Sequence, residues 1–301
     1  MDMKRLYFAV LLLCLSMMML AQGAPTGPFG PREPLAEPKL IVLENGPVTM
    51  TVDANRGGKI MSLKHGEREI ISQSRFPNSF GSTFWTSPQK EWNWPPVPQF
   101  DSKPYAIELQ EPAHLTLCSE VAERLGFRIR KDFTTDATDG AFVVTYTIVN
   151  EGKEARRVAP WEITRVANNA DGLIFFEAPA DSIWPSGLLT FEDAHGAAWY
   201  HTNEVPDNTK VNADARGWLA YCAGGLLLVK RFQDLSREEP APGEAEVQVY
   251  VNRGRTFIEL ESQGAYTMLQ PGKSLSWTVR WYLMPVSKTS EPSADLVKLA
   301  K

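Results

Sequence analysis

The sequence has 301 residues, of which 43% are hydrophobic and 22% charged, and its formal net charge is −5. This composition is typical of a globular protein and excludes a disordered tail, a collagen-like fibre and a protein with several membrane spans. Acidic residues outnumber basic ones by 36 to 31, so we expect no nucleic-acid partner. The chain also contains 22 prolines and 9 tryptophans, and their positions guide the search for a functional site.

The first 24 residues have the order of a secretory signal peptide. Lys4 and Arg5 precede an apolar run over residues 6–20, and the small-residue stretch 21–24 follows. The apolar run is shorter than the roughly 20 residues that a spanning helix needs, although an uncleaved anchor is the alternative. We expect cleavage near Gly23 or Ala24, a periplasmic or secreted protein, and no stable membrane span in the mature chain.

The residues after this leader suggest a linker and one large domain. Residues 25–38 hold five prolines and no hydrophobic periodicity, which predicts a linker. We expect the domain over residues 39–288 and a C-terminal tail over residues 289–301, in which 294–301 could form a short helix. Export leaves Cys118 and Cys222 in an oxidising compartment, which permits either a disulfide or two buried thiols.

From Leu40 onward the pattern is that of strands and turns. Asn45-Gly46 between two apolar runs predicts a hairpin. Apolar side chains alternate with period two over residues 142–148, 247–251 and 275–283, whereas no amphipathic helix of twelve or more residues is evident. These features predict an all-β fold, a single large antiparallel β-sandwich.

Three segments, taken in order, resemble the galactose mutarotase-like superfamily, which includes the aldose 1-epimerases. They are residues 43–63 with "VDANRGGKIMSL", residues 144–165 with "VTYTIVNEGKEARRVAPWEITR", and residues 247–283 with "FIELESQGAYTMLQPGKSLSWTVRWYL". Within the superfamily the chain is most similar to secreted bacterial domains that share a "GSTFWxSPQxEWNWPP"-type segment. The resemblance implies a β-supersandwich that handles sugars.

The resemblance also implies site residues. Epimerases of this type use two histidines and a glutamate: one group protonates the ring oxygen while a carboxylate removes the anomeric hydroxyl proton. Glu261, within Glu261-Ser262-Gln263, matches the glutamate. Neither histidine has an equivalent, because Pro160-Trp161-Glu162 stands where one is expected and residues 80–98 lack the other. The sequence therefore leaves open whether the protein turns over a sugar or only binds one.

The stretch "GSTFWTSPQKEWNWPPVPQF", residues 81–100, is the least ordinary part of the chain. It carries Trp85, Trp92 and Trp94 with Gln89 among them, and its prolines oppose a regular helix or a central strand. A rigid loop that presents indoles beside amides suits a sugar, whose apolar ring face stacks on an aromatic ring while its hydroxyls bond to polar groups. The alternative is a loop whose tryptophans only cover one end of the sandwich.

Charged residues on two strands complete the candidate pocket. In a regular strand Trp161 and Arg165 share one face and Glu162 lies on the other. The resemblance nevertheless places Glu162 near the missing histidine and thus near the pocket; the alternatives are a surface charge and a core tryptophan. Glu259 and Glu261 share a face, where like charges would raise the pKa of one carboxyl, as suits a general acid or base. Two solubilising charges are the alternative.

Other polar residues carry weaker signals. Arg56 lies in the turn before Gly57-Gly58. Its guanidinium could form paired hydrogen bonds with sugar hydroxyls or with a uronate carboxylate, or it could be a solvated turn residue. His195 and His201 are six residues apart, which is not a zinc spacing. The chain has neither a phosphate-cradling glycine loop nor a Gly-x-Ser-x-Gly motif. We expect no metal and no cofactor.

We therefore predict an exported carbohydrate-binding or carbohydrate-active protein whose pocket takes a mono- or oligosaccharide. The candidate catalytic residues are Glu261 and Glu162, which would act as a pair if they lie within about 10 Å of each other beneath Trp85 or Trp92. One alternative is an active aldose epimerase, an isomerase, with Glu261 as general base. Another is a structural envelope protein that keeps the fold without the pocket.

Overall fold

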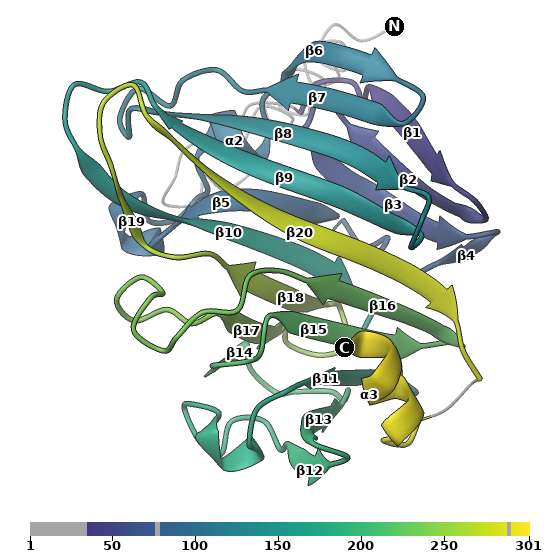
Figure 1. Ribbon diagram of the computed structural model, residues 1–301. Helices are drawn as coiled ribbons and strands as arrows, with labels where there is room; N and C mark the ends of the chain where they lie inside the picture. The colour runs from purple at the N-terminus through teal and green to yellow at the C-terminus, as the bar shows by residue number, and fades with distance from the viewer. Residues whose placement is uncertain (1–34, 76–78, 288–289) are drawn as a thin grey trace, which may run out of the picture. The chain divides into compact units, whose positions relative to one another are not determined.

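The computed structural model describes residues 35–75, 79–287 and 290–301, and nearly all its regular structure is β (Figure 1). The described strands form two antiparallel sheets of ten strands each, here called sheet A and sheet B. The predicted all-β fold with a large antiparallel sandwich is confirmed. The expected signal peptide and most of the expected linker lie outside the described residues.

Sheet A carries the residues that matter most below. Its order is β1-β2-β3-β5-β10-β18-β17-β14, with β4 beside β3 and β19 beside β10. Its strands are β1 (Leu40–Asn45), β2 (Val48–Asp53), β3 (Lys59–His65), β4 (Arg68–Glu69), β5 (Ser82–Ser87), β10 (Arg156–Val166), β14 (Thr209–Ala213), β17 (Val247–Val251), β18 (Ile258–Gln263) and β19 (Thr267–Leu269).

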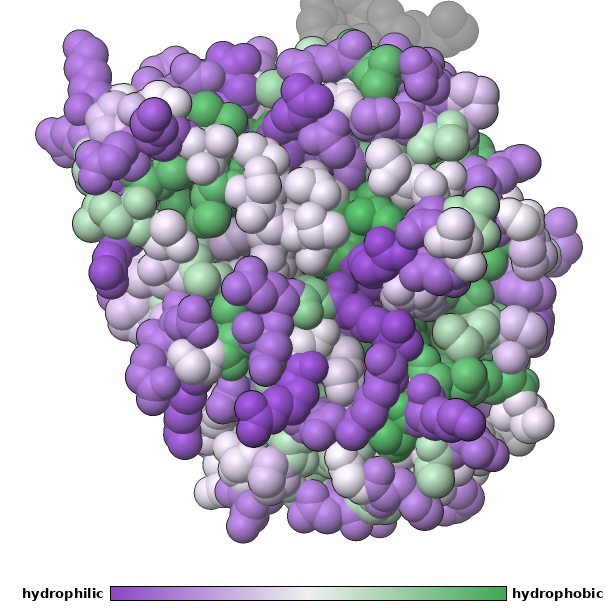
Figure 2. All heavy atoms as spheres, in the orientation of Figure 1, coloured by the Kyte–Doolittle hydropathy of each residue, from purple (hydrophilic) through white to green (hydrophobic). Residues whose placement is uncertain are grey.

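Sheet B faces the viewer in Figure 1, in the order β12-β13-β11-β15-β16-β20-β9-β8-β7-β6. Its strands are β6 (Ala106–Glu111), β7 (His114–Cys118), β8 (Phe127–Asp136), β9 (Ala141–Asn150), β11 (Leu173–Phe176), β12 (Glu192–Ala194), β13 (Ala197–His201), β15 (Trp218–Ala223), β16 (Leu226–Arg231) and β20 (Ser274–Pro285). Its outer face is a polar surface, pale and purple over most of its area in Figure 2. Hydroxyl pairs such as Thr145–Thr278, 2.8 Å apart, lie on it.

Local sequence explains the elements that were predicted. The Asn45-Gly46 turn joins β1 to β2, and Gly46 has a φ of +58°, which glycine adopts without a Cβ clash. On β20 the alternating apolar residues point inward, so that Trp277 and Trp281 are buried.

The longest described helix is the seven-residue α3 (Ala294–Ala300). Among the described residues, no helix is both long enough and apolar enough to cross a membrane.

The predicted short terminal helix is α3, and it packs on the sandwich beside β15 (Figure 1). The Ser293 hydroxyl caps it by accepting a hydrogen bond from the Leu296 N–H at 3.2 Å. Leu296 and Val297 are buried, and Arg231 of β16 donates to the Ala300 carbonyl at 3.0 Å. The end of the chain is therefore attached to sheet B.

Both cysteines of the described chain are free thiols. Cys118 ends β7 and Cys222 lies in β15, and both are buried. Burial raises the pKa of each thiol, that of Cys222 to about 11, because a thiolate would be poorly solvated there. Of the two possibilities that the sequence left open, the structure has the buried thiols.

An ion pair joins the two sheets across the core. Lys230 of β16 in sheet B contacts Glu162 of β10 in sheet A, and both side chains are 0% exposed. The carboxylate also accepts hydrogen bonds from the hydroxyls of Ser82 and Thr164, and the Lys230 ammonium donates to the Leu260 carbonyl at 3.0 Å. Such a buried pair is tolerated because each charge has its partner and further hydrogen bonds.

Breaking this pair should destabilise the protein strongly. The substitution Lys230→Met leaves Glu162 as a buried carboxylate without its cation, and we expect the free energy of unfolding to fall by about 3–5 kcal/mol. Urea unfolding at neutral pH measures it. The double variant Lys230→Met/Glu162→Gln should recover much of the loss because no buried charge remains, while Lys153→Met at an exposed turn should change nothing. A single Lys230→Met variant as stable as the wild type would contradict this account.

Candidate functional site

The predicted aromatic and charged residues meet on the outer face of sheet A, the face turned away from sheet B. Residues directly opposite each other in an antiparallel pair have their side chains on the same face. Trp161 of β10 pairs with Trp85 of β5, and Arg165 pairs with Glu259 of β18. Glu261 pairs with Ile163, so it lies on this face as well. The sheet register alone therefore assembles most of the site.

Four indoles form a cluster on this face. The ring of Trp85 lies edge-on to Trp92 and Trp161, with centroids 5.5 Å away in each case, and edge-on to Trp94 at 6.3 Å. Trp92 and Trp161 are 6.3 Å apart. Trp85, Trp92 and Trp161 are buried, whereas Trp94 is 42% exposed. The cluster thus has a buried base and one indole open to solvent.

The stretch that carries three of these indoles is only partly the irregular loop that was predicted. Residues 82–87 form β5, a strand inside sheet A, because the first proline of the stretch is Pro88. After it come a 3₁₀ turn, η2 (Gln89–Glu91), and the short helix α2 (Pro98–Asp101). Gln89 is half-buried, and its carbonyl accepts from the backbone N–H groups of Trp92 and Asn93.

Glu261 lies against the indole cluster. Its Oε2 accepts a hydrogen bond from the Trp161 indole N–H at 2.8 Å and contacts the Lys210 ammonium of β14, also at 2.8 Å. The residue is only 1% exposed, and burial raises the pKa of its carboxyl. The nearby Lys210 opposes that rise, and Glu259 adds to it. The like charge of Glu259, expected from the sequence to raise this pKa, contributes less to the rise than burial does.

Arg165 occupies the other end of the same strand face. Its guanidinium pairs with Glu259 at 2.7 Å and donates to the Phe80 carbonyl at 3.3 Å. It also lies 5.9 Å from the centre of the Trp85 ring, within cation–π range. Only 2% of its side chain is exposed, so it is held in one position rather than free in solvent.

Asp101 is a site residue that the sequence reasoning missed. It ends α2, and its Oδ1 accepts hydrogen bonds from the Trp85 indole N–H at 3.0 Å and the Thr83 hydroxyl at 3.1 Å. The Lys59 ammonium lies 3.0 Å from the same oxygen. Desolvation acts to raise the pKa of this carboxyl, but the Lys59 charge and the hydrogen bonds outweigh it and hold the pKa low. The sequence signal was its place three residues after Pro98, which favours the first turn of a helix.

Two predicted site residues lie elsewhere. Glu162 points from β10 into the core toward Lys230, so it and Glu261 are on opposite faces of sheet A and form no carboxylate pair. Its placement near the pocket was wrong because strand alternation sends its side chain away from Trp161. Arg56 is bound by neighbouring parts of the chain: its Nε donates to the Ala36 carbonyl at 2.9 Å and lies 3.6 Å from Asp53.

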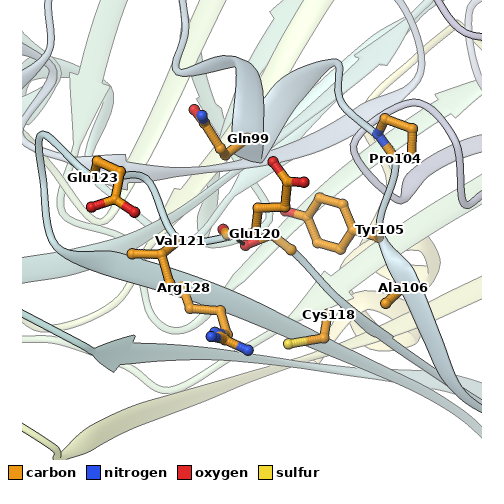
Figure 3. A pocket seen from close by; sticks show the side chains of 10 residues that line it. Gln99, Pro104, Tyr105, Ala106, Cys118, Glu120, Val121, Glu123 and Arg128 are labelled. Carbon is orange, nitrogen blue, oxygen red and sulfur yellow. Dashed lines mark hydrogen bonds between the residues drawn. The ribbon is translucent and has the colours of Figure 1, made fainter.

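A pocket of about 680 Å³ lies elsewhere, between α2 and the strands β6, β7 and β8 (Figure 3). Its lining includes Tyr105, Cys118, Glu120 and Arg128, with the Cys118 sulfur and the Arg128 guanidinium close together in the view. None of the predicted site residues lines it. The indoles that would stack on a sugar are therefore on the outer face of sheet A and not in this pocket.

Comparisons with known proteins agree on the fold. No protein-family model matches the sequence, and no curated protein does. Among solved structures, a candidate aldose 1-epimerase from Escherichia coli K12 superposes with a TM-score of 0.58 at 12% identity, over 83% of this chain and 100% of its own. A galactose mutarotase-like protein from Lactobacillus casei gives 0.58 at 14% identity, over 82% of this chain and 100% of its own. A galactose mutarotase-like protein from Clostridium acetobutylicum superposes with a TM-score of 0.55 at 11% identity, over 85% of this chain and 98% of its own. The chain has the galactose mutarotase-like fold.

No histidine belongs to this site. His65 ends β3, His114 begins β7, His195 lies in the turn between β12 and β13, and His201 ends β13 and contacts Glu192 at 2.8 Å. The cations in contact with the site carboxylates are instead Lys59, Arg165 and Lys210. Across the described ranges, no three His, Cys, Asp or Glu side chains lie close enough to hold a metal ion.

The Trp161 indole N–H should report the titration of Glu261. We expect its ¹H–¹⁵N resonance to shift with a midpoint above 4.5, the ordinary value for a glutamate, because burial raises the pKa. Substituting Lys210→Met should move that midpoint further up, since the ammonium favours the carboxylate. The control Lys153→Met should leave it in place. A midpoint that stays or falls in Lys210→Met would show that Lys210 does not stabilise the charged carboxylate.

Proposed function

We propose that the protein is an exported carbohydrate-binding protein whose sugar site is the outer face of sheet A around Trp94, Trp161, Glu261 and Lys210. The observation that carries the proposal is the single hydrogen-bonded unit Trp161–Glu261–Lys210 beside a cluster of four indoles. The export part rests on the leader-like order of residues 1–24.

The chemistry of this face suits a sugar ring. The apolar face of a pyranose stacks on an indole, and the exposed Trp94 offers one, with the buried Trp85 ring edge-on against it. The sugar hydroxyls need fixed donors and acceptors at the rim of the ring. Lys210, with 34% of its side chain exposed, and Glu261 behind it provide a donor and an acceptor.

A binding assay should separate the stacking residue from the rest of the surface. We expect isothermal titration of the mature protein against neutral and acidic mono- and disaccharides to show binding. The substitution Trp94→Ala should weaken that binding at least about tenfold, or ~1.4 kcal/mol, because a stacking surface is lost.

The export part has its own test. The mass of the purified mature chain should place its first residue near Ala24, as export requires; a chain that retains Met1 would contradict export.

The matched control is Val42→Ala, which removes a 53% exposed apolar side chain from β1 at the far edge of the same sheet. It should bind like the wild type. If no sugar of the panel binds, or if Trp94→Ala binds as well as Val42→Ala, the proposed site is wrong.

A second function, aldose epimerisation, is favoured by the raised pKa of the Glu261 carboxyl. A carboxylate whose pKa is raised toward neutrality is a better proton acceptor than an ordinary one. In this mechanism Glu261 removes the anomeric hydroxyl proton, and Lys210, in contact with that carboxylate, protonates the ring oxygen. The ring then opens and recloses to the other anomer.

NMR saturation transfer on freshly dissolved α-anomers tests the second function. An epimerase should exchange the anomers faster than buffer, and Glu261→Gln should reduce the exchange to the buffer rate because the proton acceptor is lost. The control is Glu259→Gln on the same strand face, which should keep measurable exchange. No exchange above buffer in the wild type would leave binding as the function.

A further inference from the structure

Two of the nine tryptophans stand apart from the rest. Seven belong to the buried core of the protein, namely Trp85, Trp92, Trp161, Trp199, Trp218, Trp277 and Trp281. Trp94 and Trp184 do not, although the structure describes all nine. Ile183, directly before Trp184, and Leu189, five residues after it, do pack on the core. Core packing therefore does not account for Trp184.

Trp184 lies on the same face of sheet A as the proposed sugar site. It forms an isolated antiparallel bridge with Asn212 of β14, in which Trp184 N–H donates to Asn212 at 3.0 Å and Asn212 N–H donates back at 2.7 Å. Asn212 pairs with Gln248 of β17, and Gln248 pairs with Glu261 of β18. Since paired residues share a face, these four side chains form one row across the sheet.

The row is long compared with one sugar ring. Three strand spacings separate Trp184 from Glu261, about 14 Å at roughly 4.8 Å per strand. A single pyranose that stacks on Trp94 and bonds to Glu261 cannot also reach Trp184. An oligosaccharide can, because its successive rings extend along the sheet face.

The two amide side chains of Asn212 and Gln248 lie in the row between Trp184 and Glu261. The Gln248 amide donates to Asn212 Oδ1 at 2.8 Å and to Glu244 at 2.9 Å, so these groups are fixed in orientation. Asn212 is half-buried, and Lys210, two residues away on the same face of β14, is partly exposed. Gln248 is itself buried, so Asn212 and Lys210 are the groups of this part of the face that offer solvent the donors and acceptors that sugar hydroxyls require.

The indole of Trp184 is itself held in place. The Arg237 guanidinium lies 5.1 Å from its ring centre, in cation–π range. The backbone bonds to Asn212 fix its main chain on the edge of sheet A beyond β14. A half-buried indole with an anchored backbone is a rigid stacking surface, which costs little conformational entropy on binding.

We propose that Trp184 is a second stacking platform and that the ligand is an oligosaccharide of about three or more rings, spanning from Trp94 past Glu261 to Trp184. This inference rests on the proposed carbohydrate-binding function. It assigns Trp184 to the distal rings and Trp94 to the ring nearest Glu261.

Chain-length dependence of affinity tests the inference. The probes are the malto-, cello- and chito-oligosaccharides of one to six units, titrated calorimetrically into the mature protein. In the series that binds, we expect the four-unit sugar to bind at least about tenfold more tightly than the two-unit sugar. The substitution Trp184→Ala should remove this gain and leave the two-unit affinity unchanged, Trp184→Phe should keep part of it, and Trp94→Ala should weaken both lengths.

The indole NMR resonances of the wild-type protein give a second readout, which does not depend on whether the variants fold. In the wild type, the Trp184 indole resonance should shift with the four-unit sugar and not with the two-unit sugar, whereas the Trp94 resonance should shift with both. Equal affinity for two and four units, or a gain that persists in Trp184→Ala, would overturn the role of Trp184 and leave the proposed function standing. If no sugar of any length binds, the proposed function fails and this inference with it.

Discussion

Strand alternation on β10 is the constraint on which the rest of the structure depends. β10 lies inside sheet A between β5 and β18, and the side chains on each of its two faces have a different role. Glu162 and Thr164 point toward sheet B, where Glu162 forms the ion pair with Lys230 and the Thr164 hydroxyl accepts a hydrogen bond from the same ammonium. Trp161 and Arg165 point the other way and form the centre of the candidate site. A shift of register by one residue would exchange the two sets and destroy both.

The same alternation separates two kinds of buried charge. In the core, Glu162 and Lys230 are enclosed on all sides, and their pairing serves the fold. On the outer face, three carboxylates each contact one cation: Asp101 with Lys59, Glu259 with Arg165, and Glu261 with Lys210. Buried ion pairs seldom add stability compared with apolar side chains of similar size. Their concentration beside a cluster of four indoles, one of which is exposed, therefore fits a ligand site better than a stability device.

Sequence patterns predicted the features that depend on local periodicity. The hairpin at Asn45-Gly46, the inward stripe of β20 and the outward pair Glu259 and Glu261 all follow from period-two alternation and turn chemistry, and the structure has them. Alternation also separated Glu162 from Arg165 correctly. The error came from placing Glu162 by resemblance, since a position near a missing histidine in sequence lies on the opposite face of the strand.

The parts that the sequence missed depend on long-range contacts. Asp101 reaches the site because α2 packs beside β5, and Lys210 reaches Glu261 across the intervening strand β17. Trp184 joins the row through a bridge of a single residue pair, which leaves no periodic pattern to find. Arg56 offered the right chemistry, but its guanidinium is used by neighbouring backbone and by Asp53. Tertiary packing decides each of these contacts, and it leaves no local pattern in a single sequence from which they could be predicted.

A crystal structure of the protein with its tightest-binding saccharide tests the central claim, that the outer face of sheet A is a carbohydrate site. This account predicts sugar density stacked on Trp94, with hydroxyls within hydrogen-bond distance of Glu261 and Lys210. Sugar density only in the pocket lined by Tyr105, Cys118 and Arg128, with the face of sheet A empty, would contradict it.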